Sequence, residues 1–105
     1  MQKTQMIKGF IEGFILEVLS KESLSSSEII HHLKDTSTLE ISEGTMYPLM
    51  LRMEKEGFVI SKQIYNPSGP RIKMYAITPQ GTEEKERIKK SWQIFKEIAE
   101  KLLGD

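Results

Sequence analysis

Apolar residues near the start of the chain recur at the spacing of an amphipathic helix. The apolar positions are Ile7, Phe10, Ile11, Phe14, Ile15, Val18 and Leu19. They follow the i, i+3, i+4, i+7 rule for one helix face, so Lys8, Glu12 and Glu17 are expected on the polar face. Gly9 and Gly13 lie within this helix, where each costs roughly 1 kcal/mol relative to alanine. The two glycines are either tolerated or mark a place where another helix packs closely.

A capping box predicts the start of a second helix. The Ser25 side chain can accept a hydrogen bond from a free backbone N–H of the first turn, and Glu28 can reach back to the backbone N–H of Ser25. The polar residues 35–38 predict a loop at the end of this helix.

A third helix is predicted between a cap at Ser42 and a left-handed end at Gly57. Its inner stripe consists of Met46, Leu49, Met50 and Met53. Pro48 lies inside this helix and lacks a backbone N–H, so the first turn is expected to be irregular.

The pattern then changes to that of a β-hairpin and ends in a long helix. Residues 58–65 and 72–77 are rich in β-branched and aromatic residues, and the turn-forming residues 66–70 separate them. Thr78 followed by Pro79 predicts the start of a last helix that runs to about residue 103. Its apolar seam is Ile88, Trp92, Phe95, Ala99 and Leu102. The 4, 3, 4, 3 spacing of this seam is typical of helices that pack against a partner helix.

The order helix, helix, helix, hairpin, helix predicts a mainly α fold with a small β-hairpin. We expect a winged helix-turn-helix domain over residues 1–78, with a long C-terminal helix over residues 79–105 appended to it.

Composition narrows the location and the chemistry. The 105 residues include no cysteine, which removes disulfides and thiol chemistry. No apolar run is long enough to span a membrane and the N-terminus does not resemble a signal peptide, so a cytoplasmic protein without membrane contact is expected. With 15 basic and 15 acidic residues the net charge is zero, which argues against nonspecific coating of nucleic acid.

One face of the third helix carries side chains suited to double-stranded DNA. Thr45, Pro48, Arg52 and Lys55 are spaced i, i+3, i+7, i+10. Arg52 can offer two donors to a guanine, Thr45 can contact base edges, and Lys55 suits a phosphate. Tyr47 can either pack its ring in the core or donate its hydroxyl to a phosphate, and the two are compatible.

Three cations of the predicted hairpin extend the DNA-binding hypothesis. Lys62, Arg71 and Lys73 lie close to the turn in sequence, where the hairpin of a winged helix can contact the backbone or minor groove. The alternative is a protein-interaction or adaptor module that kept the fold without binding DNA; it would lack these cations.

No pattern of an enzyme or a metal site is recognised. His31 and His32 are adjacent and face different directions on a helix, and no acidic pair or second histidine cluster accompanies them. No phosphate-binding glycine loop or metal-ligand spacing occurs either. We therefore expect no catalytic residue, metal or cofactor.

Two segments resemble the signature of the PadR family of regulators. Residues 44–59 read GTMYPLMLRMEKEGFV, similar to that family's Gly-Thr-Leu-Tyr-Pro start and Arg-Leu-Glu-x-x-Gly continuation. Residues 69–71 and 73–81 resemble its wing and the following Tyr-x-Leu-Thr-x-x-Gly segment. The sequence departs from the pattern by methionine at 46 and 53 and isoleucine at 77. The resemblance implies a homodimer, usually a repressor, that binds a palindromic operator. It makes residues 1–78 the DNA-binding domain and residues 79–105 the dimerisation helix, which packs against the partner's first and last helices, so that the N-terminal helix joins the dimer interface as well.

The resemblance also suggests an effector pocket at the dimer centre. In multidrug-binding members a tryptophan pair from the last helices stacks on flat aromatic ligands, and Trp92 falls at the matching position. Lys96 stands where those relatives carry an acidic residue, which disfavours cationic ligands. Trp92 can equally serve only as dimer-core packing. The residues assigned to the pocket or dimer core are Phe10, Phe14, Ile88, Trp92, Phe95 and Lys96.

Overall fold

The backbone follows the predicted order of elements, with one short strand added. The computed structural model describes residues 3–104, and side chains from residue 9 onward. The elements are α1 (Lys3–Leu19), β1 (Leu24–Ser25), α2 (Ser26–Ser37), α3 (Glu43–Lys55), β2 (Val59–Ile64), β3 (Ile72–Ile77) and α4 (Pro79–Leu103). The predicted fold class, mainly helical with a small hairpin, is confirmed.

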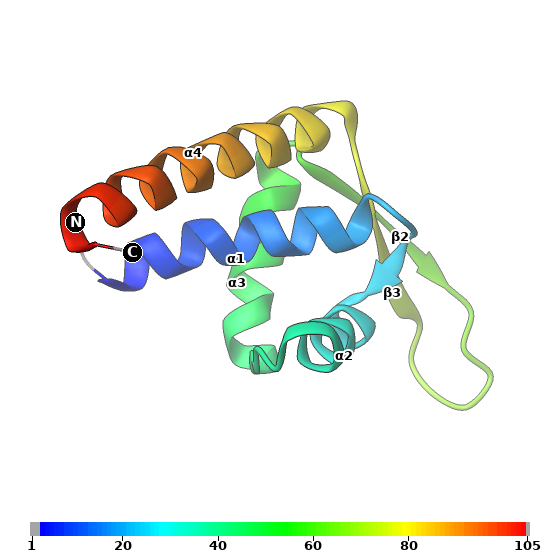
Figure 1. Cartoon of the computed structure of the whole chain (residues 1–105). Helices are drawn as coiled ribbons and strands as arrows, with labels where there is room; N and C mark the ends of the chain where they lie inside the picture. Colours follow the sequence, from blue (N-terminus) through cyan, green and yellow to red (C-terminus); the bar gives the residue numbers. More distant parts are fainter. Residues whose placement is uncertain (1–2, 105) are drawn as a thin grey trace.

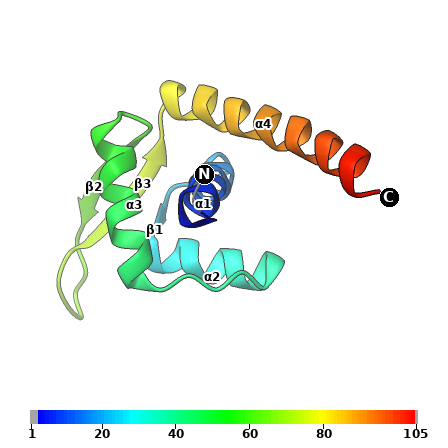
Figure 2. The same cartoon turned by 90° about the vertical axis from the view of Figure 1, so that its left-hand side faces the viewer.

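Helix α1 lies at the centre of the molecule, with α2, α3 and α4 around it (Figures 1 and 2). Ile11 and Ile15 of the predicted stripe are buried, but Leu16, outside that stripe, is fully buried as well. Glu12, expected on the polar face, is also buried. That expectation was wrong because α1 packs on several sides, whereas a single apolar stripe describes a helix with one buried face. The side chains of Ile7 and Lys8 lie outside the described residues.

The glycines of α1 differ in their surroundings. A β-carbon added at Gly13 would lie 2.6 Å from Cγ2 of Ile88 in α4, so another helix does pack closely there. A β-carbon at Gly9 would meet nothing within 4 Å. Only the second glycine therefore supports a close approach within the chain.

The capping box of α2 forms as predicted, but the helix is longer than expected. Ser25 accepts from the backbone N–H of Glu28, and Glu28 accepts from that of Ser25. Residues 35–37 remain helical, so the loop predicted there was wrong. The Ser37 hydroxyl donates to the carbonyl of Leu33 at 2.8 Å, and Thr38 ends the helix in the left-handed region. The polar residues that composition alone assigns to a loop thus form the last turn of α2, which the backbone N–H of Thr38 closes by donating to the Lys34 carbonyl.

Helix α3 begins at Glu43 and is regular through its first turn. Ser42 caps it by accepting from the backbone N–H of Thr45, and the predicted inner stripe of four residues is buried. The irregular first turn expected from Pro48 was wrong. Proline leaves only the Gly44 carbonyl without its helical donor, and Gly44 is exposed to solvent.

The hairpin forms one part of a three-stranded antiparallel sheet with strand order β1-β3-β2. The predicted strands are confirmed, and β1 pairs Leu24 with Tyr75. A strand of two residues carries too little pattern to be recognised from sequence.

Hydrogen bonds and close packing fix the start of α4 against the end of α3. The Thr78 hydroxyl donates to the Gly57 carbonyl at 2.6 Å and accepts from the backbone N–H of Gly81 at 3.0 Å. Gly57 has φ +82°, as its predicted role requires, and a β-carbon at Gly81 would clash with the Phe58 carbonyl oxygen. From this fixed start α4 extends away from the other helices (Figure 2).

Candidate DNA-binding surface

The five α3 residues predicted to contact DNA are all exposed. They are Thr45, Tyr47, Pro48, Arg52 and Lys55. Tyr47 is 67 % exposed, so the interpretation that packs its ring in the core was wrong and the phosphate contact stays a prediction. Ser42 donates to the Thr45 hydroxyl oxygen at 3.1 Å, which leaves the Thr45 hydroxyl hydrogen free to bind a base or phosphate.

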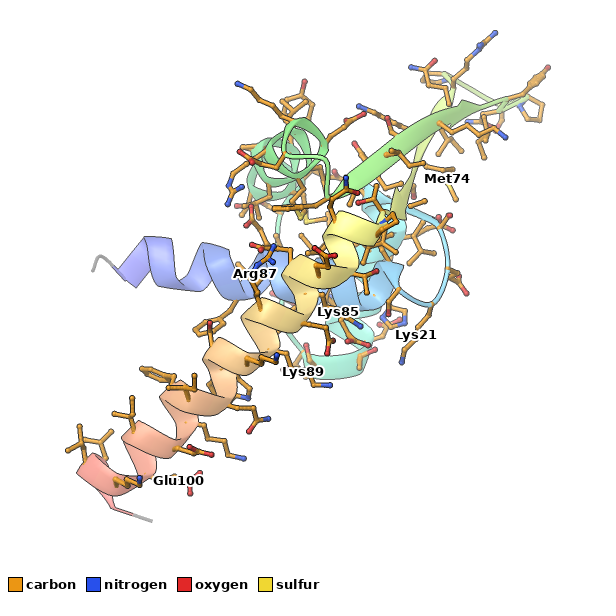
Figure 3. The ribbon with its side chains drawn as sticks, turned by 90° about the horizontal axis from the view of Figure 1, so that it is seen from above. Lys21, Met74, Lys85, Arg87, Lys89 and Glu100 are labelled. Atoms are coloured by element: carbon orange, nitrogen blue, oxygen red, sulfur yellow. The ribbon has the colours of Figure 1, made fainter. Side chains whose placement is uncertain are left out.

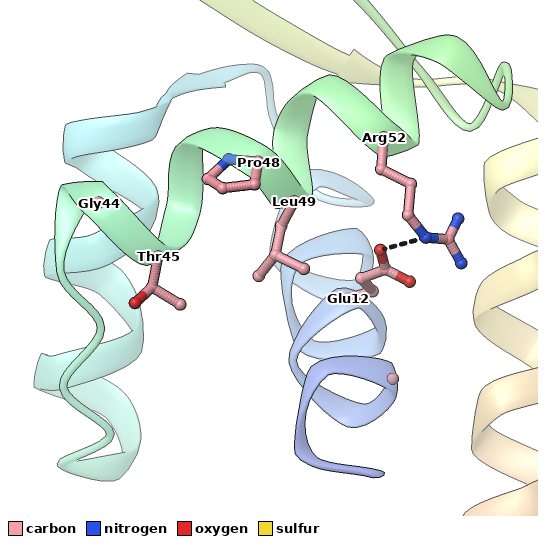
Figure 4. Close-up of a pocket in the computed structure, with 7 residues that line it drawn as sticks. Glu12, Gly44, Thr45, Pro48, Leu49 and Arg52 are labelled. Carbon is pink, nitrogen blue, oxygen red and sulfur yellow. Dashed lines mark ion pairs between the residues drawn. The ribbon is translucent and has the colours of Figure 1, made fainter. Parts of the chain in front are cut away.

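Thr45, Pro48 and Arg52 line a groove between α3 and α1. The groove has a volume of about 600 Å³, and Gly9, Glu12, Gly44 and Leu49 complete its lining (Figure 4). Nε of Arg52 lies 3.3 Å from Oε2 of Glu12, whose side chain is only 6 % exposed. Arg52 therefore shares a helix face with Thr45 and Pro48, as predicted, but its charge is paired within the chain.

The environment of Glu12 raises the pKa of its carboxyl group. Burial is the main cause, and the negative charges of Glu84 and Glu56 act in the same direction. The Arg52 guanidinium opposes this rise by stabilising the carboxylate. Glu12 thus depends on Arg52 for its only ion pair among the described side chains.

The three hairpin cations do not gather on one face. Lys62 is paired across the strands with Met74, and Lys73 with Gln63. Because cross-strand partners share a face and neighbours alternate, Lys62 and Lys73 lie on opposite faces of the hairpin. Arg71 is exposed just before β3.

Lys73 is held on the face of the hairpin that looks toward α3. Its Nζ lies 3.1 Å from Oε1 of Glu54 and 5.4 Å from the centre of the Tyr75 ring. Glu54 also accepts from the Ser61 hydroxyl at 2.6 Å. The Ser61 hydrogen bond, with help from Lys73, lowers the pKa of the Glu54 carboxyl, and Glu54 in turn raises the pKa of Lys73. This cluster connects α3 to both hairpin strands.

A second, largely apolar pocket lies between α1 and α4. It has a volume of about 390 Å³ and is lined by Phe10, Gly13, Phe14, Glu17, Lys85, Ile88, Lys89 and Trp92. Figure 3 shows Lys85 and Lys89 on successive turns of α4. The Trp92 ring stands edge-on to Phe10 at 5.9 Å and stacks on Phe95 at 6.3 Å. Four of the six residues assigned to the pocket from sequence line it, Phe95 supports Trp92 from outside, and Lys96 is absent from the lining.

Residues 15–87, well over half of the chain, match the profile of the transcriptional regulator PadR-like family. The chain belongs to the PadR-like family. The resemblance seen in sequence is therefore confirmed. The chain is a DNA-binding transcriptional regulator with a winged-helix fold. Membership also implies that the chain is not an enzyme.

Solved structures of PadR-like proteins share the whole architecture. A PadR-like transcriptional regulator of Bacillus cereus is 37 % identical, with a TM-score of 0.80 over 96 % of this chain and 98 % of that one. A PadR-like transcription factor of Bacteroides fragilis is 32 % identical, with a TM-score of 0.83 over 95 % and 96 %. A PadR family regulator of Clostridium difficile is 30 % identical, with a TM-score of 0.79 over 90 % and 99 %.

Two residues of this PadR-like chain pair with cations of the candidate DNA-binding surface, and the sequence did not predict this role for either of them. Glu12 was assigned to solvent, and Glu54 was given no role. A signal for Glu12 exists in hindsight, because Leu16 lies one helical turn away and outside the predicted stripe, which indicates a second buried face of α1. Glu54 shows no such signal, since its partners lie on separate strands.

Two structural findings concern other functions. Within residues 3–104 no helix combines the length and apolarity needed to cross a membrane. The described residues also contain no cluster of histidine, aspartate or glutamate placed to hold a metal ion. His31 and His32 are exposed on α2.

Proposed function

We propose that this PadR-like chain is a homodimeric repressor that binds a palindromic operator, with α3 in the major groove and the hairpin beside it. The observation that carries the proposal is the outward surface of α3, where Thr45, Tyr47, Pro48 and Lys55 are exposed next to a cationic hairpin. Such an exposed helix face is the part of a helix-turn-helix that enters the major groove.

The cations available to DNA are a subset of those predicted. Lys55, Lys62 and Arg71 have no carboxylate partner among the described side chains, so their charges are available for phosphates. Arg52 and Lys73 were also assigned to DNA from sequence, but each already pairs with a glutamate. We propose direct contacts for the first three cations together with Thr45, Tyr47 and Pro48.

The second half of α4 supports the assembly as a dimer, with residues 79–105 as the dimerisation helix. Its apolar side chains are left uncovered by the rest of the chain: Trp92, Ile94, Phe95, Ile98, Leu102 and Leu103. A row of this size along one helix fits burial against a second copy. A symmetric pair would present two α3 helices, which must lie about 34 Å apart to enter successive major grooves.

A small aromatic effector is the proposed signal. The pocket between α1 and α4 offers aromatic walls from Phe10, Phe14 and Trp92 beside the proposed dimer seam. A ligand there would release the operator only if it binds the two spacings of the α3 pair with different affinity. Lys85 is paired with Glu17 in the lining at 3.3 Å, whereas Lys89 in the lining and Lys96, one helical turn after Trp92, disfavour cationic ligands.

Selection of random duplexes with the purified chain tests the DNA-binding proposal. We expect an inverted repeat with half-site centres about 10 base pairs apart. In gel-shift titrations Lys55→Gln should weaken binding, whereas Lys34→Gln on α2 should not. Failure to enrich any inverted repeat would contradict the proposal. A reporter behind the selected site should be repressed by the chain; activation would retain DNA binding and reject repression.

Fluorescence of the single tryptophan tests the effector proposal separately. We would titrate the protein with naphthoate, naphthylmethanol and naphthylmethylammonium, which differ in charge. Quenching by the anionic or neutral compound, with reduced operator binding, is expected. If no compound changes the emission up to its solubility limit, Trp92 serves only in packing.

A further inference from the structure

We propose that Arg52 is a positioning residue: its ion pair with Glu12 sets how α3 lies on α1, and therefore how the outward surface of α3 meets DNA. The proposal rests on the proposed DNA-binding function, and it gives Arg52 a role other than contact with a base.

The ion pair between Arg52 and Glu12 connects α3 to α1, the helix at the centre of the molecule. Nε of Arg52 contacts Oε2 of Glu12 at 3.3 Å, from the last turn of α3 to the middle of α1 (Figure 4). The Glu12 side chain is 6 % exposed, whereas that of Arg52 is 52 % exposed. The buried carboxylate is therefore surrounded by the core, and it pairs with the more exposed partner.

Burial of Glu12 keeps Arg52 in place. Oε2 of Glu12 is fully buried and has no hydrogen-bond donor with good geometry among the described residues. If Arg52 swung toward a guanine, this carboxylate would lose the only ion pair that it makes with a described side chain, in a site that water reaches poorly. A DNA contact by Arg52 would then require an uncompensated buried charge, which an exposed cation such as Lys55 avoids.

The electrostatic surroundings of the pair also oppose a nearby phosphate. Glu56 and Glu84 both add negative potential at Glu12, and Arg87 is already paired with Glu84 at 2.9 Å. A phosphate approaching the Arg52 guanidinium would enter a region that holds three carboxylates. Arg52 is accordingly better suited to neutralise the chain's own acids than to bind DNA.

The pair controls residues that do face DNA. Thr45 and Pro48 line the same groove as Arg52 and lie on the same face of α3. A helix is stiff over this length, so a change in the angle between α3 and α1 at Arg52 moves both residues relative to the operator. Because productive contacts tolerate small displacements only, loss of the pair should reduce specific binding in particular.

Gel-shift titrations of Glu12→Gln, Arg52→Gln and the double variant test the proposal on a duplex selected by the wild-type protein. We expect each single variant to lose about tenfold in affinity for the selected duplex. The double variant should lose no more than either single variant, because the same interaction is removed in each case. Binding to a scrambled duplex and the slope of log K against log salt should stay as in the wild type. The control is Lys34→Gln, which breaks an exposed ion pair between Lys34 of α2 and Glu40 of the loop that follows α2, and should change nothing.

Arg52→Lys keeps the test decisive if a neutral variant fails to fold, which circular dichroism would reveal. Lysine can still pair with Glu12 as a point charge but cannot offer two parallel donors to guanine. We expect Arg52→Lys to retain affinity within about threefold and to select the same bases.

Three results would overturn the proposal. They are a shift of base preference at one operator position in Arg52→Lys, a salt slope reduced by about 0.9 per protomer in Arg52→Gln, and full affinity in a folded Glu12→Gln protein. If the wild-type protein selects no duplex, the DNA-binding function itself fails and the positioning role fails with it.

Discussion

Gly13 of α1 and Ile88 of α4 meet so closely that a β-carbon on the glycine would lie 2.6 Å from Cγ2 of the isoleucine. Real side chains do not approach to this distance, so one of the two helices, or the Ile88 side chain, would have to move. The contact lies in the lining of the pocket between α1 and α4. Gly13 therefore determines both the spacing of these helices and the shape of the pocket.

Gly13→Ala is expected to destabilise the protein by about 1–3 kcal/mol, the usual cost of overpacking. Gly9→Ala is the matched control, because it makes the same change one turn earlier where nothing lies within 4 Å. That control should be neutral or stabilising by up to about 1 kcal/mol, since alanine favours the helix. Urea unfolding at one protein concentration measures both. Equal effects of the two substitutions would show that α1 and α4 do not pack as described.

The Glu54 cluster predicts a stability contribution that acid removes. The pKa of Glu54 is lowered in the folded protein, so its ionised form stabilises the fold above the ordinary glutamate value of about 4.3. This contribution is lost as the pH falls through the lowered pKa. Glu54→Gln should reduce the free energy of unfolding at pH 7 by up to about 1 kcal/mol, the range for exposed ion pairs. Urea unfolding from pH 7 to pH 2 should show the difference disappearing, and a constant difference would contradict the assignment.

The raised pKa of Glu12 predicts a pH dependence of stability opposite to that of Glu54. Its pKa is raised, so the folded state holds this proton more tightly and the carboxyl group favours folding least when it is ionised. As the pH rises from the ordinary value through the raised pKa, the wild type should lose stability relative to Glu12→Gln. The same urea series measures this slope. A wild type that gains stability over the variant across that interval would contradict the raised pKa.

The hairpin cations are expected to differ in their effect on the salt dependence of operator binding. Removing one cation–phosphate interaction lowers the slope of log K against log salt by about 0.9, or by about 1.8 for a symmetric dimer. Lys62→Gln and Arg71→Gln should each show this reduction. Lys73→Gln should leave the slope unchanged, because Lys73 pairs with Glu54 instead of DNA. An equal reduction for all three would show that Lys73 leaves Glu54 when DNA binds.

Leu102 offers a clean test of the dimer. Its side chain is 79 % exposed in the single chain, so a substitution there removes little packing within the protomer. Leu102→Glu should weaken association and lower the thermal midpoint, as measured by ultracentrifugation and by melting at one protein concentration. Gln93→Glu adds the same charge on the opposite side of α4 and should have little effect. A wild type that is monomeric at micromolar concentration would reject the dimer.

Local signals explain why most of the fold could be predicted from sequence. The capping serines Ser25 and Ser42, the hairpin turn and the Thr78-Pro79 start each depend on neighbours within a few residues. Two errors arose where tertiary packing decides: strand β1 exists because Leu24 pairs with Tyr75, far away in sequence, and Glu12 is buried because α1 packs on several sides. The extension of α2 to Ser37 is an error of a different kind, because the end of that helix is set locally by the Thr38 backbone N–H bonding to the Lys34 carbonyl.

The sequence predicted which residues of α3 and the hairpin belong to the candidate site, but not which of their charges form ion pairs within the chain. The spacing of Thr45, Pro48 and Arg52 correctly placed them on one face of α3. It could not reveal that a glutamate of α1 holds Arg52, because burial of Glu12 depends on three helices meeting around α1. Likewise, sequence placed Lys62 and Lys73 near one turn, whereas strand register puts them on opposite sides of the hairpin.

The central position of α1 limits how freely such a protein can be given a new DNA target. One side of this helix contacts α3 through Glu12, and another contacts α4 at Gly13. An α3 that carries another residue at the position of Arg52 would leave the buried Glu12 without its partner, and altering α1 to suit it would disturb the contact with α4. Exchange of binding specificity between relatives should therefore succeed when α1 and α3 are moved together as one unit.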